Sequence, residues 1–171
     1  SIIRKYIGRE EILKRVAAIA NQINTDYKNI NDVVIVCVLK GAVNFFSDLS
    51  LMLDIEAEYD FIGLSSYEGT ESSGKIKITT PLPDLTDKNV ILIEDIVDTG
   101  LSMNYLNQYL TAMTSPKSIS VCTFLDKPSR RKVYFRPDYT CFTIDDLFVV
   151  GYGLDYNQKY RNLDYVGVYH G

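Results

Sequence analysis

The chain has 171 residues, 46% of them hydrophobic and 23% charged, and its formal net charge is −4 at pH 7. This length and hydrophobic share suffice for a substantial core, so we expect residues 1–171 to form a single globular domain. The negative charge argues against a general nucleic-acid-binding protein, which normally presents a basic face. No apolar stretch is long enough to cross a membrane.

Three cysteines and one histidine restrict the chemistry and the cellular compartment. Cys37, Cys122 and Cys141 lie inside apolar runs without C-x-x-C spacing, so we predict buried, reduced thiols rather than disulfides or metal ligands. The polar N-terminal stretch does not resemble a signal peptide, and we expect a cytoplasmic protein. The only histidine, His170, is remote from these runs, which excludes most catalysis by Ser-His or Cys-His pairs and most His-metal sites.

The spacing of apolar residues predicts helices that alternate with strands. In chain order, we predict a helix at 10–23, a strand at 32–40, a helix at 43–53, strands at 57–65 and 75–79, a strand that opens the segment 90–102, a helix at 103–113, and strands at 118–125, 139–144, 148–152 and 165–169. This alternation indicates an α/β fold with a mainly parallel central sheet. In such sheets ligands bind beyond the carboxyl ends of the strands.

The segment VILIEDIVDTGLS, residues 90–102, carries the main functional signal. A buried strand runs into Glu94, Asp95 and Asp98, and carboxylates this close together resist burial unless something positive lies among them. The turn and helix start that follow offer backbone N–H groups to a phosphate. Carboxylates beside a phosphate loop suit sugar hydroxyls or a divalent cation. Taken alone, Asp-Thr-Gly favours a solvated turn, but the acid pair behind a buried strand favours a functional site.

This segment resembles the phosphoribosyl diphosphate (PRPP) binding motif of type I phosphoribosyltransferases. Further motifs, in matching order, make nearly the whole chain similar to the hypoxanthine-guanine phosphoribosyltransferases: LKGA at 39–42, SSY at 65–67, LDKPSRR at 125–131 and FVVGYGLDY at 148–156. Each motif is weak alone, whereas their joint order and spacing are specific. The resemblance implies a type I phosphoribosyltransferase-like fold, in which helices flank a mainly parallel central sheet, with a small hood and a mobile lid loop.

The resemblance assigns PRPP to the strand end and turn of residues 90–102. The residues implied to bind its 5-phosphate are Asp98, Thr99, Gly100, Leu101 and Ser102. Glu94 and Asp95 are implied to face the ribose hydroxyls and to help place Mg²⁺. Asp98 is also the implied catalytic group, which takes the proton from purine N7 as N9 attacks the sugar.

The pyrophosphate of PRPP is assigned to LKGA and to a distant arginine. The resemblance implies that the backbone amides of Lys40 and Gly41 bind the leaving pyrophosphate, often with a cis peptide before the lysine. Arg161 matches an arginine that binds the same group. Without the resemblance, Lys40 is explained as a solvated strand end and Arg161 as a surface charge.

The purine is assigned to residues that follow two later strands. Lys127, held extended by Pro128, is implied to donate to the purine 6-oxo group, so adenine should be rejected. Phe148 is implied to stack on the purine, and the Val149 backbone to bond its pyrimidine edge. Asp155, which is also assigned to the purine site, resembles the family's second metal ligand, on the far side of the pyrophosphate. Without the resemblance, Phe148 and Val149 are equally well explained as core residues.

The polar segment 66–75, with Ser66 and Tyr67 at its start, resembles the lid of the family. Closure of a lid would protect a transition state that resembles an oxocarbenium ion from water. Composition alone equally allows a disordered connection between two strands.

The activity implied is magnesium-dependent transfer of the 5-phosphoribosyl group from PRPP to N9 of hypoxanthine or guanine. The products would be IMP or GMP and pyrophosphate, as in purine salvage by a homodimer or homotetramer, with no nucleic-acid or membrane partner. One alternative is a non-catalytic PRPP-sensing regulator, although the chain has no spare length or basic helix for a DNA-binding module. Another is a sister enzyme that prefers xanthine, because Val149 would read that edge of the base through its backbone.

Overall fold

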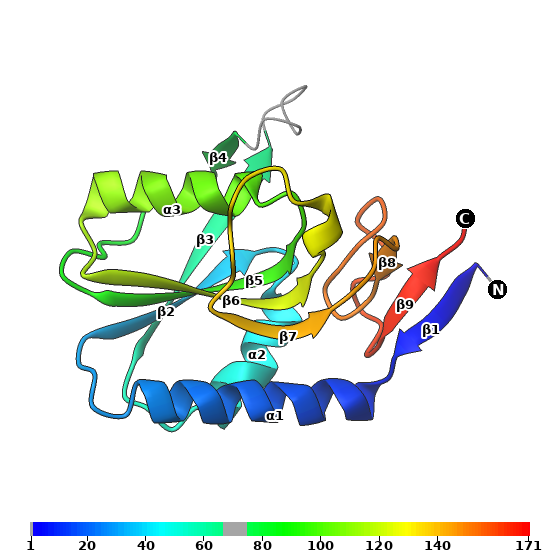
Figure 1. Ribbon diagram of the computed structural model, residues 1–171, viewed down its shortest axis with the longest axis horizontal. Helices are drawn as coiled ribbons and strands as arrows, with labels where there is room; N and C mark the ends of the chain where they lie inside the picture. The colour runs from blue at the N-terminus through cyan, green and yellow to red at the C-terminus, as the bar shows by residue number, and fades with distance from the viewer. Residues whose placement is uncertain (1, 67–74) are drawn as a thin grey trace.

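The computed structural model describes residues 2–66 and 75–171 as an α/β protein (Figure 1). In chain order its elements are β1 (Ile3–Ile7), α1 (Arg9–Asp26), β2 (Val33–Leu39), α2 (Val43–Met52), β3 (Glu58–Ser66), β4 (Ile76–Ile78), β5 (Asn89–Val97), α3 (Leu101–Thr114), β6 (Ser118–Asp126), the 3₁₀ helix η2 (Pro128–Arg130), β7 (Tyr139–Thr143), β8 (Val149–Val150) and β9 (Val166–Tyr169). The predicted α/β fold with its mainly parallel sheet is therefore confirmed.

The larger sheet has the strand order β4-β3-β2-β5-β6-β7. All its described pairs are parallel except β3 with β4. Helix α3 covers one face of this sheet, while α1 and α2 cover the other (Figure 1). Because the helices bury both faces, the inner strands consist almost entirely of apolar residues.

Side chains of the inner strands alternate between two hydrophobic clusters, one on each face of the larger sheet. On β2, Ile35 and Cys37 pack on the side of α1 and α2, whereas Val34 and Val36 pack on the side of α3. This follows from the two-residue period of a strand. The cysteines Cys37, Cys122 and Cys141 are buried free thiols, as predicted, and burial raises the pKa of Cys37 and Cys141 to about 12.

A smaller antiparallel sheet has the order β1-β9-β8. It lies beyond the carboxyl ends of β5, β6 and β7, where it forms the small hood that the resemblance implied (Figure 1). Strand β1 was not predicted, because its five residues alternate too briefly to be told from a polar terminus. Its partner is β9, at the other end of the chain, with Ile3 opposite Tyr169.

The strand predicted at 148–152 is the element that differs most from expectation, because β8 contains only Val149 and Val150. The next residues, Gly151, Tyr152 and Gly153, all have positive φ angles, of 97°, 50° and 99°. A left-handed backbone turns the chain away from the extended direction, so the strand stops. The turn that replaces it brings the following residues back toward the larger sheet.

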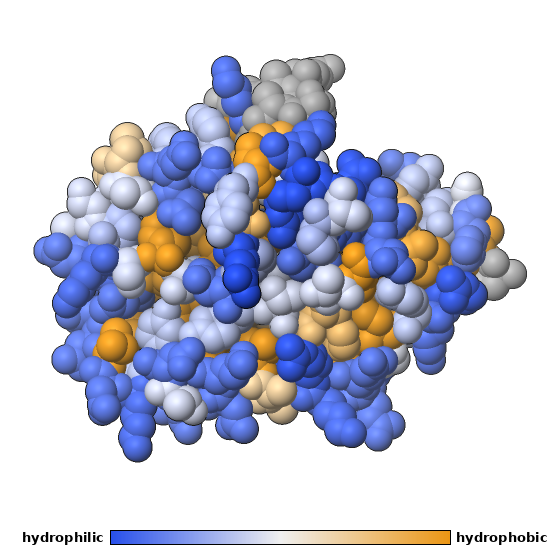
Figure 2. Space-filling view, viewed as in Figure 1, coloured by the Kyte–Doolittle hydropathy of each residue, from blue (hydrophilic) through white to orange (hydrophobic). Residues whose placement is uncertain are grey.

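On the face shown in Figure 2, hydrophobic residues form small areas separated by hydrophilic ones. Such scattered exposure is ordinary for a folded protein surface. Within residues 2–66 and 75–171, no helix has the length and apolar character to traverse a lipid bilayer.

Candidate active site

Two adjoining cavities open at the carboxyl ends of the central strands. The first, of about 410 Å³, is lined by Asp95, Ile96, Asp98, Lys127, Arg130, Asp146, Phe148, Val149, Leu154 and Asp155. The second, of about 620 Å³, is lined by Val38, Leu39, Lys40, Gly41, Leu64, Ser65, Ser66, Ile76, Glu94, Asp95, Ile96, Asp98, Ser102, Asp155, Gln158 and Arg161. Four residues, Asp95, Ile96, Asp98 and Asp155, line both cavities. Lys127 and Phe148 are 21 positions apart in the sequence, yet they line the same cavity.

The carboxyl end of β5 places Glu94 and Asp95 side by side. The Asp95 N–H donates to Glu94 Oε1 at 2.9 Å, and the Ile96 N–H donates to Asp95 Oδ1 at 2.7 Å. Burial, together with the neighbouring Asp95 charge, raises the pKa of Glu94 well above its usual range, and burial also raises the pKa of Asp95. Gly41 packs so closely on Asp95 that a Cβ atom there would overlap its carboxylate. The pair is therefore an unfavourable concentration of negative charge that a cation would relieve.

Replacing Glu94 with glutamine is expected to raise the free energy of unfolding by about 1 kcal/mol at neutral pH while lowering activity. The amide removes the penalised charge and keeps an oxygen that accepts from the Asp95 N–H. Because the pKa of Glu94 is raised by folding, its charged form destabilises the folded protein above that folded-state pKa. The penalty vanishes below the unfolded-state value near 4.5. Thermal unfolding near pH 8 and near pH 4 checks this, since the stabilisation should be present only at the higher pH. A variant less stable than the parent near pH 8 would contradict the argument.

The turn between β5 and α3 contains the residues predicted to hold a phosphate. Asp98 Oδ1 accepts from the Thr99 N–H at 2.7 Å, and Thr99 Oγ1 accepts from the Leu101 N–H at 3.3 Å. Gly100 has a φ of 82°, and α3 begins immediately after it. Ser102 lines the larger cavity from the first turn of this helix. Phosphate binding here remains a prediction, and a bound phosphate would compete with side chains for the two occupied N–H groups.

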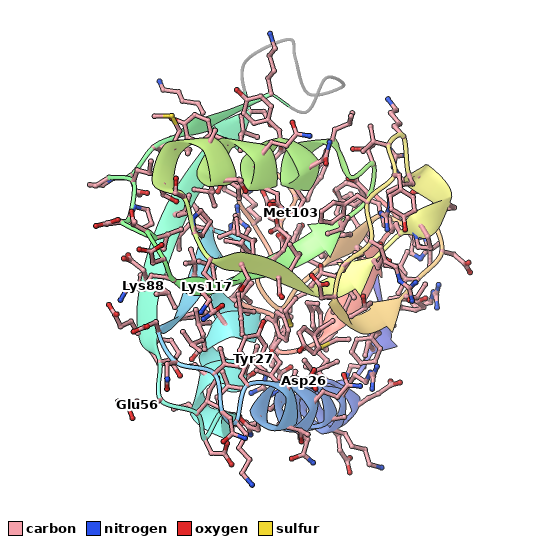
Figure 3. The ribbon with its side chains drawn as sticks, turned by 60° about the vertical axis from the view of Figure 1, so that its left-hand side comes forward. Asp26, Tyr27, Glu56, Lys88, Met103 and Lys117 are labelled. Atoms are coloured by element: carbon pink, nitrogen blue, oxygen red, sulfur yellow. The ribbon has the colours of Figure 1, made fainter. Side chains whose placement is uncertain are left out.

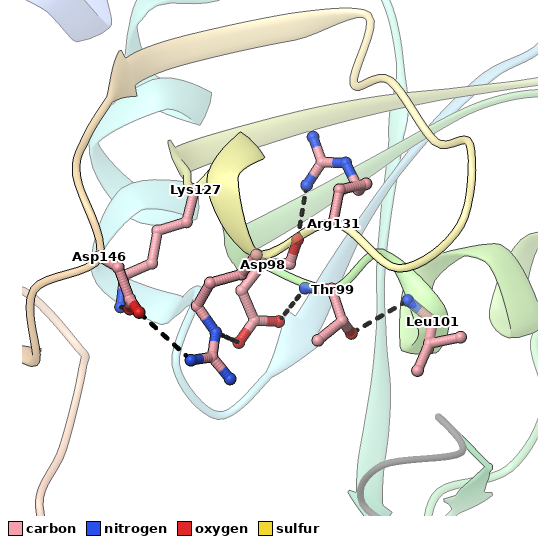
Figure 4. Close-up of polar contacts among 7 residues, drawn as sticks. Asp98, Thr99, Leu101, Lys127, Arg131 and Asp146 are labelled. Carbon is pink, nitrogen blue, oxygen red and sulfur yellow. Dashed lines mark hydrogen bonds and ion pairs between the residues drawn. The ribbon is translucent and has the colours of Figure 1, made fainter.

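A partly buried arginine, Arg131, contacts this turn, and Figure 4 shows its hydrogen bond to the Asp98 main chain. Arg131 Nη1 donates to the Asp98 carbonyl at 2.7 Å, and its Nη2 forms an ion pair with Asp126 at 2.8 Å. Its Nε donates to the Phe135 carbonyl at 2.9 Å. A guanidinium held at three points therefore fixes the Asp98 carbonyl and, with it, the backbone of the turn.

Lys127, which follows β6, and Phe148, which precedes β8, both line the smaller cavity. The Lys127 side chain is almost fully buried, and its ammonium lies 3.6 Å from Asp146 Oδ1. Phe148 is 53% exposed and meets Tyr156 and Tyr169 edge-on, so it is not a core residue. Val149 is buried at the start of β8. The stacking role of Phe148 remains a prediction that the exposure of its side chain would allow.

Lys40 and Arg161 meet in the larger cavity although they are far apart in the sequence. The Leu39–Lys40 peptide is cis, as the resemblance implied. Lys40 Nζ and Arg161 Nη2 both approach Gln158 Oε1, at 3.4 and 3.0 Å. Arg161 Nη1 donates to the Gly153 carbonyl at 2.7 Å, and Arg161 Nη2 lies 3.5 Å from Asp155 Oδ1. The two cations are thus gathered beside the loop that was assigned to pyrophosphate.

Sequence reasoning missed Arg130, Asp146 and Gln158, and it gave no role to Arg131. Arg130 and Arg131 stand inside the LDKPSRR motif, so their position beside Lys127 was the only available signal. Asp146 is part of an acidic pair before Phe148 that resembles any solvated loop. Nothing in the local sequence distinguishes these side chains from surface charges.

Three carboxylates at the larger cavity are candidate ligands for a divalent cation. Carboxylate oxygens of Glu94, Asp95 and Asp155 are the ligands that Mg²⁺ prefers, and all three residues line the larger cavity. Over residues 2–66 and 75–171, however, no group of three or more His, Cys, Asp or Glu side chains is close enough to hold a metal ion. Mg²⁺ commonly binds to one or two protein carboxylates and completes its coordination with water and substrate oxygens.

Another cavity of about 620 Å³ lies where the parallel strands begin, at the opposite end of the larger sheet. Tyr27 and Glu56, both labelled in Figure 3, are among its lining residues. None of the predicted site residues lines it. Of the predicted lid, Ser66 lines the larger cavity at the site, and Tyr67 lies outside the described residues.

Comparison with known proteins gives consistent results. The family model of the phosphoribosyl transferase domain matches residues 7–157. The hypoxanthine-guanine phosphoribosyltransferase of Bacillus subtilis (strain 168) is 43% identical over 169 residues, which cover 98% of this chain and 93% of that protein. The hypoxanthine-guanine-xanthine phosphoribosyltransferase of Tritrichomonas foetus is 40% identical over 167 residues, covering 96% of this chain and 90% of that protein. A crystal structure of a hypoxanthine-guanine phosphoribosyltransferase from Bacillus anthracis has a TM-score of 0.92 and 39% identity, with 98% of this chain and 99% of that chain covered.

Proposed function

Since the chain belongs to the phosphoribosyl transferase family, we propose that its site transfers the 5-phosphoribosyl group of PRPP to N9 of hypoxanthine or guanine. The products are IMP or GMP and pyrophosphate, as expected of an enzyme of purine salvage. The observation that carries this proposal is the pair of cavities that share Asp95 and Asp98. A base in one cavity and PRPP in the other would meet beside the two carboxylates.

The reaction breaks the bond between C1 of the ribose and pyrophosphate and forms a bond from C1 to N9 of the base. As N9 donates its electron pair, the proton on N7 must leave, and Asp98 accepts it. Lys40, Gly41 and Arg161 bind the departing pyrophosphate and stabilise its negative charge. When bound at Glu94, Asp95 and Asp155, Mg²⁺ supplies positive charge to the pyrophosphate and to the ribose hydroxyls. The 5-phosphate is held by residues 98–102.

Lys127 selects the base through its ammonium group. An ammonium donates hydrogen bonds and accepts none, so it matches a 6-oxo group and opposes the 6-amino group of adenine. Its burial strengthens this discrimination, because a buried ammonium without an acceptor is costly. Phe148 stacks on the ring, and the Val149 backbone bonds the pyrimidine edge.

Replacing Lys127 with methionine is expected to raise the KM for hypoxanthine about tenfold or more while the KM for PRPP changes little. Methionine keeps most of the side-chain volume and removes the donor. Steady-state kinetics with each substrate varied in turn provide the measurement. Substitution of Lys132 with methionine in the same loop is the matched control, since Lys132 does not line either cavity. Unchanged kinetics for hypoxanthine would remove the assigned role.

The direct test of the proposed function is a panel of bases. The purified protein is incubated with Mg²⁺, PRPP and hypoxanthine, guanine, xanthine, adenine or no base, and the nucleotides are separated by chromatography. IMP and GMP without AMP are the expected products, and the relative rate with xanthine ranks the sister activity. Protein that binds PRPP but forms no nucleotide from any base would instead be a PRPP-sensing regulator, which a DNA mobility shift with and without PRPP then examines.

Four further expectations accompany this proposal. Residues 1–171 act as a single domain, and the enzyme is a homodimer or homotetramer in the cytoplasm. Ser66 and Tyr67 belong to a lid that closes over the reacting groups and keeps water from the electron-deficient sugar. Sedimentation with and without PRPP determines the assembly state, and the rate of PRPP hydrolysis without a base reports how well water is excluded.

A further inference from the structure

Four charged side chains form a row of alternating sign along the smaller cavity. Lys127 Nζ lies 3.6 Å from Asp146 Oδ1, and Asp146 Oδ2 lies 3.4 Å from Arg130 Nη1. Arg130 Nε in turn lies 3.7 Å from Asp98 Oδ2. All four residues line the same cavity, and Figure 4 shows Lys127, Asp146 and Asp98 around the guanidinium that links the two carboxylates. The row runs from the group that recognises the base oxygen to the group that takes the base proton.

The end members of the row have opposite charges and share one cavity. Two such groups attract each other, and a direct ion pair would occupy the space needed for the O6 and N7 edge of a base. Within the described part of the chain, the ion pairs of Lys127 and Asp98 instead go to Asp146 and Arg130. Each end member therefore pairs with a middle residue of the row.

We propose that Arg130 and Asp146 are positioning residues that hold Lys127 and Asp98 in two separate ion pairs, so that both end groups stay available to the O6 and N7 atoms of a 6-oxopurine. This inference rests on the proposed function, because it takes the base in the smaller cavity as given. Neither middle residue needs to touch the reacting atoms. The row contains two cations and two carboxylates, so its net charge is zero.

The solvent exposure of the row indicates that its ion pairs strengthen when a base is bound. The side chains of Arg130, Asp146 and Asp98 are each about half exposed, so their pairs are weak while the cavity holds water. A flat base that enters the cavity displaces this water and lowers the local dielectric constant, which strengthens the same pairs. The positioning effect therefore appears in the affinity for the base and its nucleotide, and less in the stability of the free protein.

The test uses the variants Asp146→Ala and Arg130→Ala and the combined variant. Each single change is expected to raise the KM for hypoxanthine about fivefold and to leave the KM for PRPP within twofold. The combined variant should be little worse than either single variant, because the two residues act as one connection. Arg130→Lys should restore part of the loss, since it returns the charge without the planar guanidinium. Asp145→Ala and Arg136→Ala remove nearby exposed charges outside the cavity and serve as controls.

Calorimetry with IMP adds a readout that does not depend on turnover. IMP binding should weaken about fivefold in the same variants, and thermal unfolding should show that they remain folded. Folded variants with unchanged hypoxanthine KM and unchanged IMP affinity would overturn the inference, as would fully additive losses in the combined variant. An unsubstituted protein that forms no nucleotide would instead overturn the proposed function. In that case, IMP calorimetry on the variants would still show whether Arg130 and Asp146 position the groups that bind a 6-oxopurine.

Discussion

Replacing Asp98 with asparagine is expected to lower kcat for nucleotide formation by about a hundredfold or more while PRPP still binds. The amide is nearly the same size as the carboxylate, and its oxygen still accepts from the Thr99 N–H, so the turn keeps its conformation. It cannot take a proton from N7, because an amide is a far weaker base than a carboxylate. Single-turnover rates with hypoxanthine, together with PRPP affinity from calorimetry, provide the measurement.

The matched control is Asp145→Asn, which removes one exposed carboxylate that lines neither cavity. Its kcat should stay within twofold of the parent. If Asp98→Asn retained full activity, another group would have to accept the proton. If it lost PRPP binding together with activity, the role of Asp98 would be to hold the phosphate turn.

Replacing Gly153 with alanine is expected to disrupt the pyrophosphate site and to destabilise the fold by about 2 to 4 kcal/mol. Gly153 has a φ of 99°, which alanine adopts only with strain. An added Cβ would also overlap the carbonyl oxygen of Gly41, so the two segments would have to separate. Because Arg161 donates to the Gly153 carbonyl, the displacement would carry the arginine with it. A lower melting temperature and a KM for PRPP raised tenfold or more are the expected results.

Gly8→Ala is the control for this change. An added Cβ at Gly8 would meet no atom within 4 Å, and the φ of Gly8 is −78°, which alanine adopts freely. Stability and KM should therefore hardly change. A Gly153→Ala protein with the melting temperature and PRPP kinetics of the parent would show that the contact with Gly41 does not support the site.

Local pattern was sufficient to predict the helices, the inner strands and the acidic end of β5. Each of these depends on a period of two or 3.6 residues or on a run of apolar side chains, which a short window of sequence contains. The placement of Glu94 and Asp95 beside a ligand cavity follows from the rule that sites lie at the carboxyl ends of parallel strands. Helix α1 extends three residues beyond the predicted end at residue 23, to Asp26, because helix boundaries carry a weaker signal than helix interiors.

The remaining part of the site depends on contacts that no local pattern encodes. Lys40 and Gln158 are 118 positions apart and meet only because the turn after β8 folds back on the larger sheet. Arg130 and Asp146 are 16 positions apart, and the intervening loop gives no sign that they face each other. The resemblance assigned roles to Lys127 and Asp98 but not to Arg130 and Asp146, which connect them in space. Only the three-dimensional contacts show this connection.

The pairing of β1 with β9 has a consequence for the order in which the protein folds. In the larger sheet most paired strands follow one another along the chain, and even the β2–β5 pair joins Val33 to Asn89. Strand β1 must find a partner more than a hundred and fifty positions away, as Ile3 opposite Tyr169 shows. Contacts of such long range are formed late, because closing a long loop costs entropy before it gains a contact. The small sheet that β1 completes contains Val149 and adjoins Phe148, whereas Glu94 belongs to the larger sheet. Folding should therefore complete the half of the site that holds the sugar phosphate first and the half that holds the base last.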